Sequence, residues 1–374
     1  MTARAGSSRS EGPPARPRRP LREELERSVG VPERPGPLRW AGSGREVVYS
    51  GRLAGRPGLR LHLGFDGWRE PVREVAFQLD DAGRAVAELP DPDGHRVVDC
   101  TVRTDGEWDN NGGADYRLWI GWSPIDSHLH ARHGGWDRLG FAALETALSS
   151  AGIGTGIISW RDNEAVDRLV AGSPWLRQLV WVVPGRTPVA EVRRRLEAGH
   201  VGLKLHPSVD RFPADDRRLD PYLRLAAEAR VPVAVHSAPG NADPDRIRRL
   251  ADRFGSVPVV LYHTYLGPPW GRRRAARHAR RQPNLHLETS WCGSGEVLRL
   301  VDEVGPDRVL FGSDGAVDGP WHFVQRPPNV EGRQTYNQVL LAVAGQLDPA
   351  AARKVLRDNT SRLFGLVSAR RGSG

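Results

Sequence analysis

The chain has 374 residues, of which 26% are charged and 39% hydrophobic, a mixture that excludes a disordered chain and a membrane protein. No stretch approaches 18 uninterrupted apolar residues, so no membrane span and no membrane partner are expected. The two cysteines, Cys100 and Cys292, exclude a disulfide scaffold and a cysteine-rich zinc module. The N-terminus carries arginines with no apolar stretch behind them, which predicts a cytoplasmic protein without a secretory signal.

The formal net charge is +9, and 52 of the 54 basic residues are arginine. The densest basic run, residues 272–281, is predicted to form a solvated helix face, with a phosphate-binding surface as the alternative. We expect no nucleic-acid partner. Lysine is scarce in this chain, so Lys204 at a predicted strand end indicates that an amine is required there. An amine can lose its proton or be carboxylated, whereas a guanidinium group cannot.

Two composition changes divide the chain. Residues 1–36 are rich in Pro, Arg, Gly and Ser and are predicted to be a disordered basic tail. Residues 37–121 contain short apolar or alternating runs separated by turn signals, which predicts a small antiparallel β-sandwich. The expected strands are residues 46–49, 59–63, 74–77, 85–89, 97–102 and 116–120.

Residues 122–374 alternate apolar runs with amphipathic segments. The runs are residues 125–130, 153–160, 179–183, 201–206, 233–236, 259–263, 285–288 and 309–313. Eight such units in about 250 residues predict an α/β domain with a (β/α)8 TIM-barrel fold, with a doubly wound open sheet as the alternative. The join at residues 119–124 is too short for a flexible linker, so the two domains are expected to pack together.

Histidines and acids fall at the ends of the predicted strands. His128 and His130 are two residues apart and therefore share one side of a strand, as do Lys204 and His206. In a closed barrel these residues meet at one mouth, together with the strand-end residues His236, His263 and Asp314. Neutral imidazoles with one carboxylate suit a divalent ion, zinc first, with manganese, iron and nickel as alternatives.

These motifs resemble the amidohydrolase superfamily. The resemblance rests on Asp126-Ser-His-Leu-His130 and on residues 202–207, 307–314 and 359–366, and it covers about residues 124–367. The branch it indicates is the amidohydrolase-related group, which also contains metal-dependent decarboxylases. The resemblance implies that His128, His130, His236 and Asp314 are metal ligands. It further implies that His263 is a substrate-facing acid/base or a second metal ligand.

Two segments depart from that pattern, residues 263–267 and residues 315–320. Both lie at the expected substrate mouth, so the resemblance does not extend to the substrate. Lys204 has two interpretations: a carboxylated amine that bridges two metals, or an amine that holds an anionic substrate group beside one metal. We favour one metal.

The expected ligands predict a mechanism. A bound divalent ion lowers the pKa of its water to roughly 7. Asp314 is expected to accept that water's proton, and His263 to polarise a carbonyl or protonate the product. With an amide, ester or lactone the result is hydrolysis of a C–N or C–O bond. With a β-keto or hydroxyaryl acid the same groups would release carbon dioxide.

Aromatic residues near the predicted strand ends indicate walls for a small-molecule substrate. Trp160, Trp270, Trp291 and Trp321 offer flat apolar surfaces for sugar or aromatic rings. Arg161, beside Trp160, is placed to meet a carboxylate, and His206 to face the substrate.

The N-terminal module resembles the starch-binding family 25 carbohydrate-binding modules. The resemblance rests on residues 61–68 and 106–116 and covers about residues 40–121. It implies His62, Trp68 and Trp108 as a sugar platform, with Asn110 as a hydroxyl partner and an α-glucan as the ligand. The alternative is that Trp108 belongs to the core and that Asn110 begins only a turn.

Three functions therefore stay open: a metal-dependent hydrolase, a metal-dependent decarboxylase or lyase, and a glycan-binding protein with a non-catalytic barrel. The intact histidine and aspartate set argues against the third. The sequence leaves the oligomeric state open, including a homo-oligomer.

Overall fold

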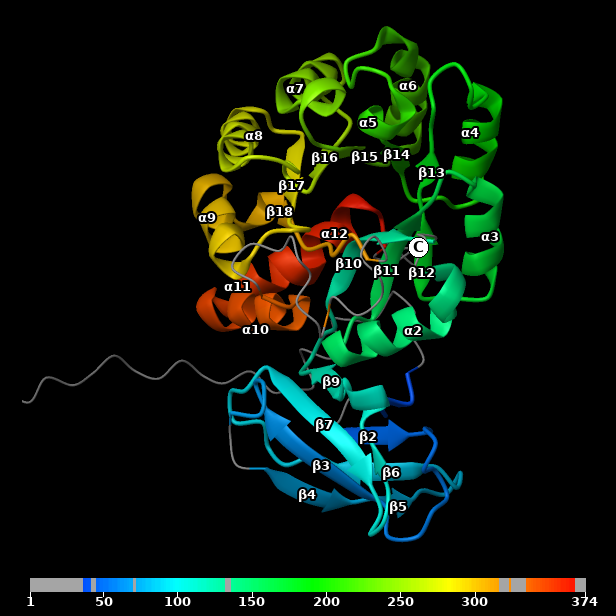
Figure 1. Ribbon diagram of the computed structural model, residues 1–374, viewed down its shortest axis with the longest axis vertical. Helices are drawn as coiled ribbons and strands as arrows, with labels where there is room; N and C mark the ends of the chain where they lie inside the picture. Colours follow the sequence, from blue (N-terminus) through cyan, green and yellow to red (C-terminus); the bar gives the residue numbers. More distant parts are fainter. Residues whose placement is uncertain are drawn as a thin grey trace, which may run out of the picture.

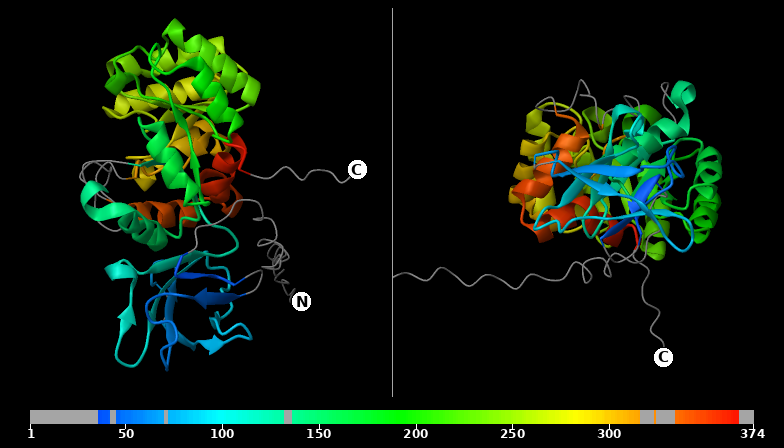
Figure 2. Two further views of the ribbon diagram at one scale, coloured as in Figure 1. Left: turned by 90° about the vertical axis from the view of Figure 1, so that its right-hand side faces the viewer. Right: turned by 90° about the horizontal axis from the view of Figure 1, so that it is seen from below.

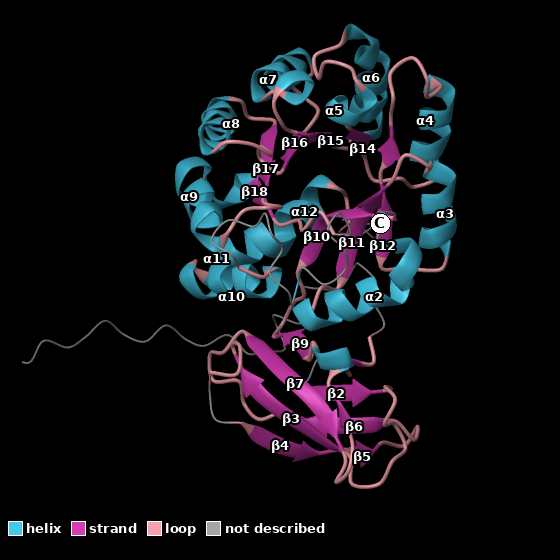
Figure 3. Cartoon of the chain, viewed as in Figure 1, coloured by secondary structure: helices cyan, strands magenta, loops and turns pink. Residues whose placement is uncertain are grey.

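The computed structural model describes residues 36–41, 45–69, 72–131, 136–315, 323 and 334–366. Apart from residue 36, the predicted disordered tail lies outside these residues. Figure 1 shows two regions, an antiparallel β region drawn in blue and cyan and a larger α/β region. Figure 3, which is coloured by secondary structure, shows mostly strands in the first region and both strands and helices in the second.

The N-terminal region consists of two antiparallel sheets, with strand orders β1-β2-β6-β5 and β4-β3-β7-β8, and with β9 paired to β7. The strands are β1 Leu38–Trp40, β2 Glu46–Tyr49, β3 Arg60–Phe65, β4 Arg73–Ala76, β5 Gln78–Leu79, β6 Ala85–Glu88, β7 Val97–Arg103, β8 Trp108–Asp109 and β9 Tyr116–Trp119. The predicted antiparallel β-rich region is confirmed. The sequence analysis missed the short strands β1, β5 and β8.

Alternation along the strands produces the core of this region. On β3, Leu61 and Leu63 are fully buried, whereas His62 between them is partly exposed. They pack with Val47 of one sheet and Val98 of the other in a shared apolar cluster. Side chains of both sheets therefore form one shared hydrophobic core.

The second region alternates strands and helices, as predicted for an α/β domain. Its strands are β10 Ile125–His130, β11 Thr155–Ser159, β12 Leu176–Gln178, β13 Val180–Trp181, β14 Leu203–Leu205, β15 Val233–His236, β16 Val259–Tyr262, β17 Leu285–Glu288 and β18 Val309–Leu310. Its helices are α2 Trp136–Ala151, α3 Asn163–Ala171, α4 Val189–Glu197, α5 Pro207–Asp210, α6 Asp220–Ala229, α7 Pro244–Arg253, α8 Pro269–Arg281, α9 Ser294–Val304, α10 Tyr336–Gln346, α11 Pro349–Arg353 and α12 Asn359–Leu363.

The strands pair in parallel as two sheets, β10-β11-β12 and β13-β14-β15-β16-β17-β18. Helices α3, α4 and α6 to α9 lie around the outside of the strands (Figure 1). The strand-to-strand hydrogen bonds do not join all nine described strands into one closed ring. One gap lies at Leu179, where the first sheet ends with β12 and the second sheet begins with β13. At the other junction, the Ser127 amide donates to the Phe311 carbonyl at 3.1 Å, so the segment after β18 lies beside β10.

The arginine-rich run forms α8 and is partly tied into the structure. Arg272 is buried and donates to the Tyr265 carbonyl, and Arg274 pairs with Asp243 and Asp245. These intramolecular contacts account for part of the arginine-rich run. Among the described residues, no helix has both the length and the apolar character that crossing a bilayer requires.

The two regions are in contact, as the short join at residues 119–124 predicts, and Figure 2 shows them stacked along the long axis. The Trp119 indole donates to the Ala151 carbonyl at the end of α2 (2.8 Å), and the Asn111 amide donates to the Thr146 carbonyl (3.0 Å). Arg117 of β9 reaches the Asn337 carbonyl on α10 and forms a buried ion pair with Asp99 at 2.6 Å.

We expect Arg117→Met to lower the free energy of unfolding by about 3–5 kcal/mol, because it leaves the Asp99 carboxylate buried without its partner. Urea denaturation measures this change. Arg84→Met, which removes a solvent-exposed pair with Asp80, serves as the control and is expected to leave the midpoint unchanged. Equal midpoints for the two variants would contradict the role of this ion pair at the contact.

Candidate metal centre

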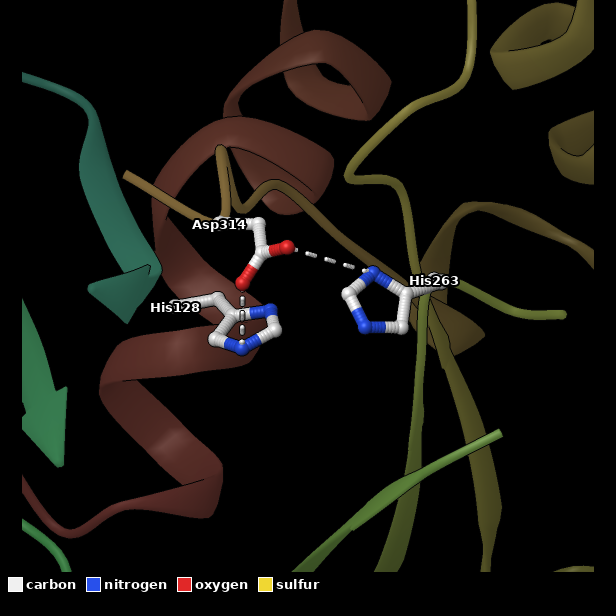
Figure 4. A group of neighbouring side chains, drawn as sticks. All are labelled: His128, His263 and Asp314. Carbon is white, nitrogen blue, oxygen red and sulfur yellow. Dashed lines mark ion pairs between the residues drawn. The ribbon is translucent and has the colours of Figure 1, made fainter. Parts of the chain in front are cut away.

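Three side-chain atoms from the two ends of the α/β region converge at one point. The Nε2 atoms of His128 and His130, both on β10, lie 3.1 Å apart. Asp314, four residues after β18, places its Oδ1 atom 3.1 Å from His128 Nε2 and 3.0 Å from His130 Nε2. All three side chains are buried. Figure 4 shows the carboxylate of Asp314 facing the ring of His128, with His263 on its other side.

Hydrogen bonds on the far side of each imidazole fix the direction of its Nε2 atom. His130 Nδ1 lies 3.1 Å from the Ser159 carbonyl, which can only accept, so Nδ1 carries the proton and Nε2 presents a lone pair. His128 Nδ1 lies 3.2 Å from Glu288 Oε2. That carboxyl group also accepts from the His263 backbone amide (2.9 Å) and from the Ser290 hydroxyl (2.7 Å). The Nε2 atoms of both rings therefore face Asp314 Oδ1.

This donor set fits a divalent cation. Protein ligands at about 2.0–2.2 Å from a metal ion lie roughly 3 Å from each other, which is the spacing of these three atoms. Burial raises the pKa of Glu288 to about 8 and that of Asp126 to about 7, whereas the pKa of Asp314 is lowered, so Asp314 is the most fully ionised of the three buried carboxyl groups. A divalent ion would balance the negative charge of Asp314, which burial otherwise makes costly.

The protonation states also suit metal binding. Burial, and then the nearby Lys204 amine, hold the pKa of His128 well below its usual value. Burial lowers the pKa of His263 to about 3. For Asp314, burial acts to raise the pKa, but His263, His130 and Lys204 outweigh it and hold that pKa below the usual value. His128 and His263 are thus neutral and Asp314 is ionised, which are the ligating forms.

His236 and His263 form a second imidazole pair beside the first. His263 Nε2 lies 3.0 Å from His236 Nδ1, and His263 Nδ1 lies 2.8 Å from the Ser290 hydroxyl and 4.0 Å from Asp314 Oδ2. The ligand atoms of His128, His263 and Asp314 also all lie within 4.8 Å of one another. His263 therefore lies at the centre, and His236 contacts it through the His263 ring.

The backbone around the centre is strained. His263, Thr264, Trp291 and Asp314 have φ angles between 54° and 67°, in the left-handed region that non-glycine residues seldom adopt. Such residues collect at functional sites, where the surrounding structure holds them in place. A side chain on Gly312 would lie 2.5 Å from Glu288 Oε1, so glycine is needed for this segment to approach Glu288.

Lys204 is completely buried on β14 and lies at the candidate metal centre. Its Nζ atom is 3.1 Å from His128 Nε2 and 3.8 Å from the centre of the Tyr262 ring. Burial lowers its pKa to about 7, against the opposing charges of Asp314 and Glu288. The amine is therefore poised between its charged and neutral forms near neutral pH.

A row of rings extends from the centre. The Trp160 ring lies 6.0 Å from that of His130, and Trp181 lies 6.3 Å from His130 and 5.6 Å from His206. The His206 ring in turn stacks on His236 at 3.9 Å. His206 Nδ1 accepts from the Val209 amide at 3.3 Å, which leaves its Nε2–H as a donor.

The other predicted substrate residues lie in different settings. Trp291 is buried and donates its indole N–H to Asp314 Oδ2 at 2.8 Å, so it orients the carboxylate instead of forming an open wall. Arg161 donates to Asp210, and Trp270 is 52% exposed against Tyr265. Trp321 and residues 316–320 lie outside the described residues.

Sequence reasoning missed Glu288, Ser290 and Trp181 as site residues. Glu288 ends a predicted strand, and an acidic residue at that position is the signal that could have identified it. Trp181 also ends a strand, β13. Asp126, part of the first motif, holds β10 to the chain after β18, because it accepts from the Ser313 amide and hydroxyl.

In the N-terminal region, the residues predicted for a sugar platform do come together. The His62 ring lies 5.8 Å from that of Trp68 and 5.2 Å from that of Trp108, which is 47% exposed. A side chain on Gly64 would meet the Trp68 ring at 2.8 Å, so glycine makes room for that indole. Asn110 accepts from the Gly113 amide at 3.1 Å and thereby caps a turn.

Comparison with known proteins decides the family. The amidohydrolase family profile matches residues 142–366, more than half of the chain. The chain belongs to the amidohydrolase family. It is an enzyme of amidohydrolase type, and His128 and His130 lie just before the matched segment. No curated protein sequence matches the chain.

Several solved structures are similar to part of the chain. An uncharacterised TIM-barrel protein from Bordetella bronchiseptica is 21% identical, with a TM-score of 0.52 over 65% of this chain and 99% of that chain. A 4-oxalomesaconate hydratase from Rhodopseudomonas palustris is 16% identical, with a TM-score of 0.49 over 65% and 96%. A putative 2-pyrone-4,6-dicarboxylic acid hydrolase from Pseudomonas putida is 17% identical, with a TM-score of 0.47 over 65% and 98%. At 21% identity, the likeness to the Bordetella bronchiseptica protein shows the fold alone.

We expect Glu288→Gln to weaken metal affinity by about 10–100-fold, because the amide no longer fixes the His128 ring as the carboxylate does. Competition with a chromophoric chelator measures the affinity. Glu197→Gln, on the exposed end of α4, is the matched control and should bind metal as the wild type does. Unchanged affinity in Glu288→Gln would contradict the orienting role of this side chain.

Proposed function

We propose that the chain is a metal-dependent hydrolase that activates water to cleave a C–N or C–O bond of a small polar substrate. The observation that carries this proposal is the convergence of His128 Nε2, His130 Nε2 and Asp314 Oδ1 within 3.1 Å. We further propose that the two parallel sheets act as one (β/α)8 barrel in a domain of residues 122–374, preceded by a β domain of residues 37–121. The carboxyl ends of the strands then surround the centre.

In this proposal His128, His130 and Asp314 hold one divalent ion, zinc first, with His236 or His263 completing the set. The ion would supply Lewis acidity and a water whose pKa is lowered to roughly 7. Trp291 keeps Asp314 Oδ2 in place by donating to it. Asp314 is then positioned to accept a proton and pass it to the leaving group.

The remaining side chains would bind and orient the substrate. His263 stands 4.0 Å from Asp314 and is held by the Ser290 hydroxyl, so it can polarise a carbonyl or move a proton. The Nε2–H of His206 offers a hydrogen bond, and the rings of Trp160 and Trp181 offer apolar contact. The Lys204 amine, buried beside His128, would hold an anionic group of the substrate next to a single metal ion.

We expect Asp314→Asn to lower kcat by about 10²–10⁴-fold. The neutral amide cannot accept the proton of the water, and it lacks the negative charge with which Asp314 would bind the metal ion. A panel of amides, esters and lactones, followed by acid release, measures hydrolysis. A parallel panel of hydroxyaryl and β-keto acids, followed by carbon dioxide release, detects decarboxylation.

Asp302→Asn, on the exposed face of α9, is the matched control and should keep full activity. Carbon dioxide release without hydrolysis would assign the chain to the decarboxylases of its family instead. Full turnover by Asp314→Asn would contradict the mechanism in either reaction.

We also propose a second function for the N-terminal region, the binding of an α-glucan on the His62, Trp68 and Trp108 rings. The observation in its favour is that the three rings lie together on one sheet while Trp108 stays 47% exposed. The apolar face of a sugar packs on such rings. Arg103 supports the Trp108 indole from 5.5 Å and is itself held by Glu74.

We expect Trp108→Ala to abolish sedimentation of the protein with insoluble starch, because it removes the exposed part of this ring platform. Trp270→Ala, which removes an equally exposed tryptophan from the α/β region, is the control and should sediment as the wild type does. If wild type and both variants stay in the supernatant, the region is a structural domain without glucan affinity.

A further inference from the structure

The lining of a cavity of about 430 Å³ includes four arginines, Arg161, Arg186, Arg211 and Arg218. Arg161 follows β11, Arg186 follows β13, and Arg211 ends α5, which follows β14. These positions all come after the carboxyl ends of parallel strands, which is also where His130, Lys204 and Asp314 lie. The cavity volume falls in the range of small-molecule sites.

The positive charge of the cavity exceeds the negative charge near it. Asp210, whose side chain is wholly buried, is engaged by Arg161 and by the Trp181 indole. Arg218 is paired with Asp216. Arg186 and Arg211 form no side-chain hydrogen bond or ion pair with any residue that the structure describes. The cavity therefore retains the charge of two exposed guanidinium groups.

The backbone at the end of α5 places Arg211 at the cavity. Arg211 has a φ angle of 57° and ends α5 in the left-handed conformation, with its amide bonded to the Pro207 carbonyl. Its side chain is exposed and lines the cavity together with that of Arg186.

Trp181 connects the cavity to the metal centre. Its ring lies 6.3 Å from that of His130, and its indole N–H donates to Asp210 Oδ2 at 2.9 Å. The Trp181 side chain thus contacts both the imidazole cluster and the carboxylate that anchors Arg161.

We propose that the cavity binds the phosphomonoester group of the substrate, which places phosphorylated small molecules in the substrate class. A phosphomonoester carries a charge of about −1.5 to −2 at neutral pH and matches two free guanidinium groups, whereas a carboxylate carries one. Guanidinium groups also meet phosphate oxygens in paired hydrogen bonds. The assignment as a substrate group rests on the proposed hydrolase function, but phosphate binding in the cavity does not.

Calorimetric titration of the purified protein with phenyl phosphate tests this proposal. We expect the double variant Arg186→Gln/Arg211→Gln to bind at least about tenfold more weakly than the wild type, because two charged hydrogen-bond donors are lost. Arg224→Gln, an exposed arginine on α6 outside the cavity, is the control for overall charge and should bind as the wild type does.

His128→Ala separates this site from the metal centre, and we expect it to retain phenyl phosphate binding. Wild-type affinity in the double variant would overturn the proposal, as would loss of binding in His128→Ala alone. Equal affinity of the wild type for phenylacetate would overturn the phosphate assignment. Because phenyl phosphate binding requires no turnover, these outcomes are independent of whether Asp314→Asn abolishes hydrolysis.

Discussion

The arrangement of the α/β region depends on the contact between its first strand and the segment after its last one. There, Asp126 accepts hydrogen bonds from Ser313, and the Ser127 amide donates to the Phe311 carbonyl. These bonds bring the two ends of the region together. As a result, Asp314 faces His128 and His130, although it follows them by more than 180 residues in the chain.

That closure is electrostatically demanding. It buries Asp126, Glu288 and Asp314 with four imidazoles, of His128, His130, His236 and His263, and the amine of Lys204. The Nε2 atoms of His128 and His130 and the Oδ1 atom of Asp314 converge on one point, at which a divalent cation fits. The left-handed backbone at His263, Trp291 and Asp314 indicates that the protein accepts strain to hold this geometry.

Much of this arrangement could be predicted from the sequence because it follows local rules. Period-two alternation placed His128 and His130 on one side of a strand, and the count of apolar runs gave the α/β order. Glu288 was missed because its role depends on long-range proximity to His128, 160 residues away. Trp291 was expected to form an open wall of the substrate site, but it is buried. Its indole N–H donates to Asp314, a contact that only the fold reveals. The arginine cavity likewise depends on three loops whose relative positions no local pattern determines.

The most direct test of the account is a crystal structure of the protein with its metal, with anomalous diffraction recorded at the metal's absorption edge. The account predicts one strong anomalous peak at about 2.0–2.2 Å from His128 Nε2, His130 Nε2 and Asp314 Oδ1. An anomalous map without a peak among these atoms, from crystals grown with excess zinc or manganese, would contradict it.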